Sequence, residues 1–126
     1  MVDIILSIKP EFAEKILNGE KLFEFRKQVP KQEVSWVFIY ASSPNKRIIG
    51  RFRVKNILNG SPQDIWELCG SRGGIDRDRF FEYCGDKEIV YGFEITEVNR
   101  FEPPIDPYEE NEGFTAPQSF AYFDNK

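Results

Sequence analysis

The residues from Gly19 to Arg26 carry the side chains best suited to bind a charged or polar ligand. Lys21, Glu24 and Arg26 lie in one stretch of alternating residues, just after a predicted helix end. In a β-strand, Glu24 and Arg26 share a face about 7 Å apart, so a carboxylate acceptor stands beside a planar guanidinium. Such a pair can hydrogen-bond a base edge, a phosphate or a sugar. The spacing also fits an exposed ion pair worth about 0–1 kcal/mol, so both interpretations stay open.

Tyr40 and Lys46 form a second candidate, at the two ends of a predicted hairpin turn. Tyr40 ends one strand and Lys46 begins the next, so the hairpin brings them close together. A lysine beside a hydroxyl can transfer protons when its pKa is lowered, and it can stabilise charge that develops on a phosphate. The alternative is that Tyr40 packs in the wall of the fold and Lys46 is an ordinary turn lysine.

A row of mostly basic residues alternates along the strand that follows. Its predicted outward-facing members are Arg47, Ile49, Arg51, Arg53 and Lys55. A phosphate chain can follow such a row, and each phosphate contact makes binding more sensitive to salt. A solvated outer face that resists edge-to-edge pairing is the alternative.

The composition excludes several chemistries. The 126 residues include no histidine and two cysteines, so Ser-His-Asp and Cys-His catalysis and histidine-bound metals are excluded. We expect no metal and no cofactor, and any catalysis must use lysine, tyrosine, serine or carboxylates. Two unpaired cysteines, with no long apolar run and no signal peptide, predict a cytoplasmic protein outside the membrane.

The charge is unevenly distributed along the chain. The formal net charge is −4, from 17 basic and 21 acidic residues. Residues 1–60 hold 11 basic and 6 acidic side chains, a net of +5, and residues 61–126 hold 6 and 15, a net of −9. Because exposed charges act over about 8 Å in physiological salt, a basic surface in the first half can bind an anion.

The hydrophobic pattern predicts one α+β domain over residues 1–126. Strands are expected at 3–8, 21–27, 34–42, 47–58 and 88–99, and the turn at 42–47 makes two of them antiparallel. Helices are expected to start at Pro10, after Ser61 and after Asp76, whereas residues 103–113 read as a loop. The aromatic segment 117–123 is expected to pack back on the body. Short strands with interleaved helices suggest a small mixed or antiparallel β-barrel with flanking helices.

Gly19-x-Lys21-x-x-Glu24-x-Arg26 resembles the G-x-K-x-x-E-x-R signature of the ASCH domain family, a branch of the PUA-like superfamily. Four further segments are similar to that family. They are Leu6-Ser7-Ile8-Lys9-Pro10, Ile39-Tyr40-Ala41-Ser42-Ser43-Pro44, Ile49-Gly50 and Pro117-Gln118-Ser119-Phe120. The resemblance implies a barrel with a cleft that faces RNA or a nucleotide, and it brings Ser119 beside Tyr40 and Lys46.

From the resemblance we expect a monomeric RNA- or nucleotide-binding protein. The expected ligand contacts are Lys9, Lys21, Glu24, Arg26, Tyr40, Ser42, Arg51 and Arg53. The alternative is a histidine-free hydrolase of the same family, a ribonuclease or an N4-acetylcytidine amidohydrolase, with Lys21, Tyr40, Lys46 and Ser119 as catalytic residues. The amidohydrolase branch has threonine where this chain has Glu24, which argues against that activity. A protein-interaction domain that uses the acidic half is a third possibility.

Overall fold

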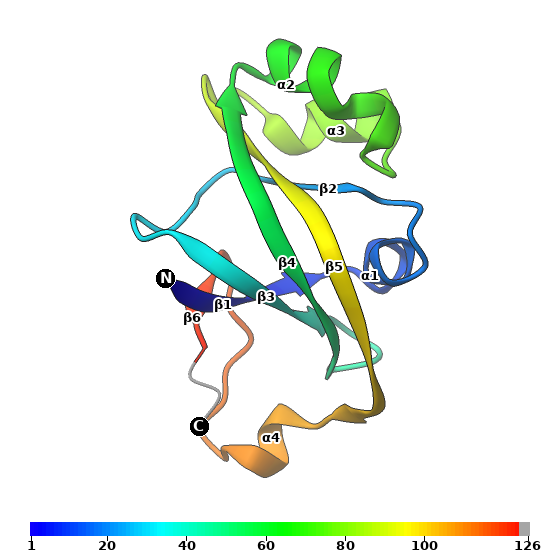
Figure 1. The fold of residues 1–126 in the computed structure, drawn as a ribbon, viewed down its shortest axis with the longest axis vertical. Coiled ribbons are helices and arrows are strands. Elements are labelled where there is room, and N and C mark those ends of the chain that lie inside the picture. Colours follow the sequence, from blue (N-terminus) through cyan, green and yellow to red (C-terminus); the bar gives the residue numbers. More distant parts are fainter. Residues whose placement is uncertain (124–126) are drawn as a thin grey trace.

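A mixed β-sheet with helices at both ends forms the body of the protein in the computed structural model, which describes residues 1–123 (Figure 1). In chain order the elements are β1 (Val2–Ile8), α1 (Pro10–Leu17), β2 (Phe23–Arg26), β3 (Val34–Ala41), β4 (Arg47–Gly60), α2 (Pro62–Cys69), a 3₁₀ turn (Gly70–Arg72), α3 (Arg77–Cys84), β5 (Val90–Ile105), α4 (Pro107–Glu110) and β6 (Ala121–Tyr122).

The six strands lie in the order β2-β5-β4-β3-β1-β6. Strands β1 and β3 are parallel, with Ser7 opposite Tyr40, and the other neighbours are antiparallel. The predicted α+β fold with a mixed sheet is therefore confirmed. Among residues 1–123 no strand pairing joins the edge strands β2 and β6, so the barrel-like sheet is open at this seam.

The helices begin where the capping residues predict. The Ser61 hydroxyl accepts a hydrogen bond from the Asp64 N–H at 3.1 Å, and the Asp76 carboxylate accepts one from the Arg79 N–H at 2.9 Å. Each cap satisfies a backbone donor that the first turn leaves free. The predicted loop at 103–113 is wrong in part, because β5 continues to Ile105 and α4 follows, capped by Asp106.

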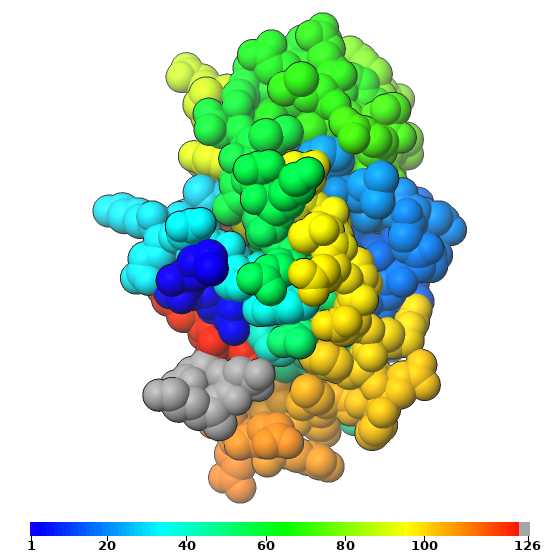
Figure 2. Space-filling model, viewed as in Figure 1, coloured from blue at the N-terminus to red at the C-terminus, as the bar shows by residue number. Residues whose placement is uncertain are grey.

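Apolar side chains fill both faces of the sheet. Strand β2 places Phe23 and Phe25 in a cluster under α2 and α3, so that Glu24 points to the other side. In the space-filling view the blue segment that carries β2 lies directly below the green helices α2 and α3 (Figure 2). Alternation along this short strand therefore anchors it in the core and leaves polar groups facing away.

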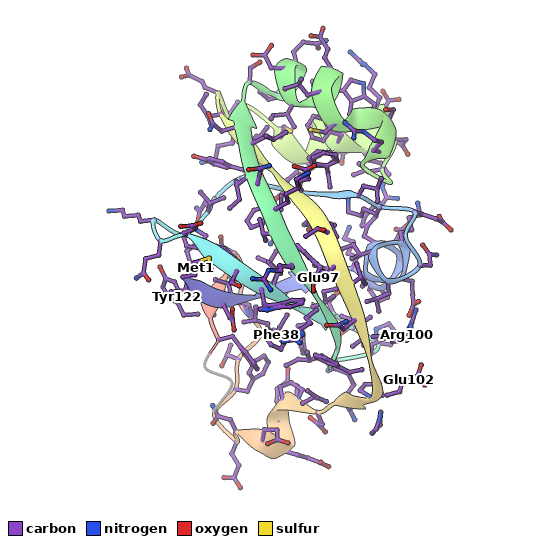
Figure 3. All side chains as sticks on the ribbon, in the orientation of Figure 1. Met1, Phe38, Glu97, Arg100, Glu102 and Tyr122 are labelled. Carbon is purple, nitrogen blue, oxygen red and sulfur yellow. The ribbon has the colours of Figure 1, made fainter. Side chains whose placement is uncertain are left out.

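The C-terminal segment packs back on the sheet, as the aromatic pattern predicts. Strand β6 pairs with β1, with Ile5 opposite Ala121. Phe38 of β3, labelled in Figure 3, packs on this segment, and its ring centroid is 4.3 Å from that of Phe123. The C-terminal segment thus covers an apolar face of the sheet.

At Gly50 the neighbouring chain leaves no room for a side chain. A Cβ atom at this position would stand 2.5 Å from the Asn99 carbonyl oxygen and 2.8 Å from a Leu17 methyl carbon. We expect Gly50→Ala to lower the free energy of unfolding by about 1–3 kcal/mol, as overpacking does in other cores. Urea unfolding measures this loss. Gly113→Ala is the control, because its Cβ would meet only Asn111 at 3.4 Å; equal effects would contradict the packing argument.

Candidate functional site

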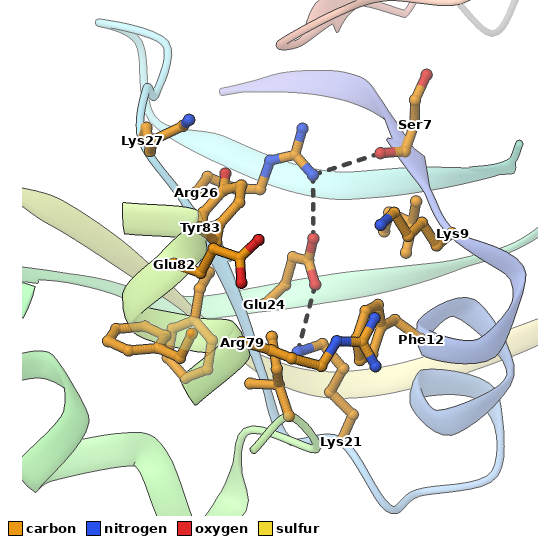
Figure 4. Close-up of a pocket in the computed structure, with 14 residues that line it drawn as sticks. Ser7, Lys9, Phe12, Lys21, Glu24, Arg26, Lys27, Arg79, Glu82 and Tyr83 are labelled. Carbon is orange, nitrogen blue, oxygen red and sulfur yellow. Dashed lines mark hydrogen bonds and ion pairs between the residues drawn. The ribbon is translucent and has the colours of Figure 1, made fainter. Parts of the chain in front are cut away.

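A pocket of about 610 Å³ opens between β2, the end of β1, and helices α1 and α3 (Figure 4). Charged and aromatic side chains alternate around it. The lining residues are Ser7, Ile8, Lys9, Phe12, Lys21, Glu24, Phe25, Arg26, Lys27, Ile75, Arg79, Phe80, Glu82 and Tyr83. Four of the predicted ligand contacts, Lys9, Lys21, Glu24 and Arg26, therefore meet in one cavity.

The floor of the pocket is a chain of three charged side chains. Lys21 Nζ lies 3.6 Å from Glu24 Oε1, and Arg26 Nη1 donates to Glu24 Oε2 at 3.1 Å. Lys21 and Glu24 are only 3% and 5% exposed, so this is not the exposed ion pair that the spacing also allowed. One carboxylate engages both cations, one on each oxygen.

Two consecutive glycines bring a backbone loop onto Lys21. Lys21 Nζ donates a hydrogen bond to the Gly73 carbonyl oxygen, and Lys15 Nζ donates to that of Gly74 at 3.1 Å. Gly74 has a φ of +65°, and a Cβ there would stand 2.9 Å from the Lys21 Cβ. Burial under this loop lowers the pKa of the Lys21 amine, and the Glu24 carboxylate offsets part of that shift.

Arg26 bridges the open seam of the sheet. Its guanidinium donates to the Ser7 carbonyl oxygen of β1 at 3.4 Å and to the Ser119 carbonyl oxygen at 3.1 Å. The Ser7 hydroxyl in turn donates to the Pro117 carbonyl oxygen at 2.8 Å. Arg26 thus links β2 to β1 and to the C-terminal segment by hydrogen bonds across the open seam.

Helix α3 supplies part of the pocket that we did not predict from the sequence. Arg79, Phe80, Glu82 and Tyr83 line it, and the Lys27 ammonium lies 4.7 Å from the Tyr83 ring centroid. Burial raises the pKa of the Tyr83 hydroxyl. Helical spacing behind the Asp76 cap puts these residues on one side of the helix, but nothing in the sequence shows that this side meets β2.

Tyr40 and Ser42 do not line this pocket. The Tyr40 hydroxyl hydrogen-bonds the Tyr108 hydroxyl at 2.8 Å, and burial together with this bond raises the pKa of Tyr40 to about 12. Ser42 is partly exposed in the hairpin turn, and Lys46 is exposed there with a φ of 54°. Of the residues predicted to act with Tyr40, Ser119 instead contacts Arg26 through its carbonyl oxygen.

Arg51 and Arg53 lie away from the pocket, on the outer face of β3 and β4. The guanidinium carbons of Arg51 and Arg53 lie 3.9 and 5.4 Å from the Trp36 ring centroid. The predicted row is wrong at Ile49, which is 6% exposed in the core beside Phe52. A register shift opposite Tyr40 inserts one extra residue in β4, and a bulge of this kind reverses the alternation.

The fold and the pocket together define a small barrel-like α+β domain with a charged cleft between its sheet and its helices. The family model of the ASCH domain matches residues 6–122, and the chain belongs to this family. The membership of the ASCH domain family that the sequence predicts is therefore confirmed.

Relatives in the family include a protein of Zymomonas mobilis subsp. mobilis named as an ASCH domain-containing ribonuclease. It is 28% identical over 123 residues, which cover 95% of this chain and 83% of the relative. A crystal structure of ASCH from Zymomonas mobilis superposes with a TM-score of 0.90 at 27% identity, and covers 98% of this chain and 88% of that one. The large ribosomal subunit protein uL22 of Ureaplasma parvum serovar 3 is 25% identical over 94% of this chain, which spans 38% of that relative.

Among residues 1–123, no helix is long and apolar enough to cross a membrane. No group of three or more histidine, cysteine, aspartate or glutamate side chains in the same range is arranged to hold a metal ion.

Proposed function

We propose that the pocket binds single-stranded RNA or a nucleotide. The observation that carries this proposal is the charge of the lining: five cationic side chains, Lys9, Lys21, Arg26, Lys27 and Arg79, against the carboxylates of Glu24 and Glu82. The pocket therefore has a net of +3 in a chain with a net of −4. Positive charge concentrated in a concave site attracts anions from solution.

The other lining residues suit the rest of a nucleotide. Phe12 and Tyr83 are partly exposed and supply aromatic surface, and unstacked bases pack on such side chains. Phe25 and Phe80 are buried behind them. A volume of about 610 Å³ falls within the range of small-ligand pockets. We still predict that Arg51 and Arg53 contact a longer RNA strand on the outer face of β3 and β4.

Salt-dependent RNA binding tests this proposal. Filter binding of a short single-stranded RNA at two salt concentrations should show an affinity that falls steeply with salt. Lys9→Ala with Lys27→Ala should weaken binding and flatten the log–log salt slope by about 1.4, since each phosphate contact on a single strand contributes about 0.7. The matched control is Lys31→Ala with Lys87→Ala, two exposed lysines that do not line the pocket. Absence of RNA binding at low salt, or equal effects of the two double variants, rules the proposal out.

A histidine-free ribonuclease is the second candidate function, and the lowered pKa of Lys21 favours it. A relative over 95% of this chain is named as a ribonuclease. A neutral Lys21 amine can keep one N–H on the Gly73 carbonyl oxygen while its lone pair accepts a proton. It would take the proton of a ribose 2′-hydroxyl. The 2′-oxygen then bonds to phosphorus, the bond from phosphorus to the 5′-oxygen breaks, and the leaving 5′-oxygen takes up a proton from solvent. Tyr40, Lys46 and Ser119 are the other proposed catalytic residues. We propose no acetylcytidine activity, because both Glu24 oxygens are already engaged.

A further inference from the structure

Arg79 and Glu11 form a bridge across the mouth of the pocket. Arg79 Nη2 donates to Glu11 Oε1 at 3.0 Å and Nη1 to Oε2 at 3.3 Å, which joins α3 to α1. The guanidinium carbon lies 4.7 Å from the centroid of the Phe12 ring, a wall of the pocket. In the close-up Arg79 lies in front of Lys21 and beside Phe12 (Figure 4).

We propose that Arg79 exchanges Glu11 for a phosphate group of the RNA strand when the strand enters the pocket. This inference rests on the proposed function and assigns to Arg79 the first phosphate contact at the mouth. Glu11 then acts as an internal substitute for that phosphate, which keeps the guanidinium oriented while the pocket is empty.

The exchange is favourable because the bridge is exposed. The Arg79 and Glu11 side chains are 42% and 51% exposed, and pairs in such surroundings contribute little and weaken with salt. A phosphate presents two oxygens to the same guanidinium fork that now holds two carboxylate oxygens. The Phe12 ring, 4.7 Å from the guanidinium carbon, is a second contact for Arg79 that does not depend on Glu11.

The same helix carries a matched control. Arg100 of β5, labelled in Figure 3, holds Glu14 of α1 with two bonds of 3.1 and 2.8 Å, and the side chains are 41% and 51% exposed. Neither residue lines the pocket. Glu14→Gln therefore makes the same charge change on the same helix as Glu11→Gln, and it breaks a pair of the same kind.

The test is RNA affinity in a double-mutant cycle. Glu11→Gln should tighten binding of a short single-stranded RNA by about two- to fivefold, the range that an exposed pair allows. Glu14→Gln should change it by less than about 1.5-fold. In the Arg79→Ala background the gain from Glu11→Gln should disappear, because coupled residues are not additive.

Three results would overturn the exchange: equal gains in the two glutamine variants, no gain or a loss for Glu11→Gln, or a gain that persists without Arg79. Each of them is measured against a wild-type protein that binds RNA. A wild-type protein that does not bind RNA at low salt rejects the proposed function itself, and the exchange with it. The two failures are therefore distinguishable.

Discussion

Glu24→Gln is expected to lower the free energy of unfolding by about 3 kcal/mol at neutral pH. The variant keeps the shape of the side chain and removes the one charge that faces both Lys21 and Arg26. Lys21 is 3% exposed, so water cannot replace the lost partner. Removal of one member of a buried ion pair leaves the other charge uncompensated, and this is far more costly than the loss of an exposed pair.

The loss should depend on pH, and its direction follows from Lys21. Burial holds the pKa of Lys21 below its ordinary value of 10.5, and Glu24 opposes that shift. Below 10.5 the unfolded chain therefore binds more protons at Lys21 than the folded chain does, so the contribution of Lys21 to stability rises with pH. Without Glu24 the pKa of Lys21 falls further. The difference between wild type and variant should be largest where Lys21 is charged in both, and should shrink as pH rises and Lys21 becomes neutral.

Urea unfolding between pH 6 and pH 10 measures both expectations. Glu33→Gln is the control, because it removes an exposed carboxylate with no ion pair among residues 1–123. We expect that change to cost less than about 0.5 kcal/mol at every pH. A loss for Glu24→Gln no larger than this, or a loss that grows with pH, would contradict the charged floor described above.

Local spacing placed Lys21, Glu24 and Arg26 in one short segment but left open whether they form a binding site or an exposed ion pair. Glu24 and Arg26 alternate with Phe23 and Phe25 along β2, so the apolar pair determines which face these two charges take. Lys21 precedes the strand, and alternation does not place it. What spacing could not supply is the burial of the site. That depends on the loop at Gly73 and Gly74, which is 52 residues from Lys21 in the chain and reaches it only through tertiary packing.

The remaining parts of the site could not be predicted from local sequence patterns for the same reason, because they too depend on tertiary packing. A helix face becomes a pocket wall only when another element meets it, and the meeting of α3 with β2 is not encoded in Arg79 or Tyr83 alone. The alternation along β4 is likewise broken by a one-residue bulge at Ile49, which a period-two pattern does not reveal. Tyr40 was correctly expected at a strand end, but its hydroxyl is held by Tyr108, a residue of the segment predicted as a loop.

Lys21→Met is expected to reduce RNA cleavage by about 10² to 10⁴-fold if Lys21 is the proton-transfer group, the usual contribution of general acid–base catalysis. Methionine keeps most of the apolar stem in the space between Phe12 and Phe25, whose ring centroids lie 5.4 and 5.0 Å from Lys21 Nζ. Single-turnover cleavage of a labelled RNA measures the loss. A thermal melt shows whether the variant is folded, and RNA binding by the same variant separates a lost catalytic step from a lost ligand.

Lys46→Ala distinguishes a reaction at Lys21 in the pocket from a reaction at Lys46 in the hairpin turn. Lys46 is exposed in the hairpin turn, so its removal should leave the fold intact, and it should leave cleavage unchanged if the chemistry takes place in the pocket. A large loss for Lys46→Ala with little for Lys21→Met would instead place the reaction at the hairpin beside Tyr40. The raised pKa of Tyr40, about 12, makes its hydroxyl a proton donor rather than a base at neutral pH.

The pH profile of cleavage adds an independent criterion. If cleavage needs a neutral Lys21, its rate must rise with pH through a midpoint below 10.5. A rate that falls over that range would mean that Lys21 acts in its charged form, as a phosphate-binding group and not as a base.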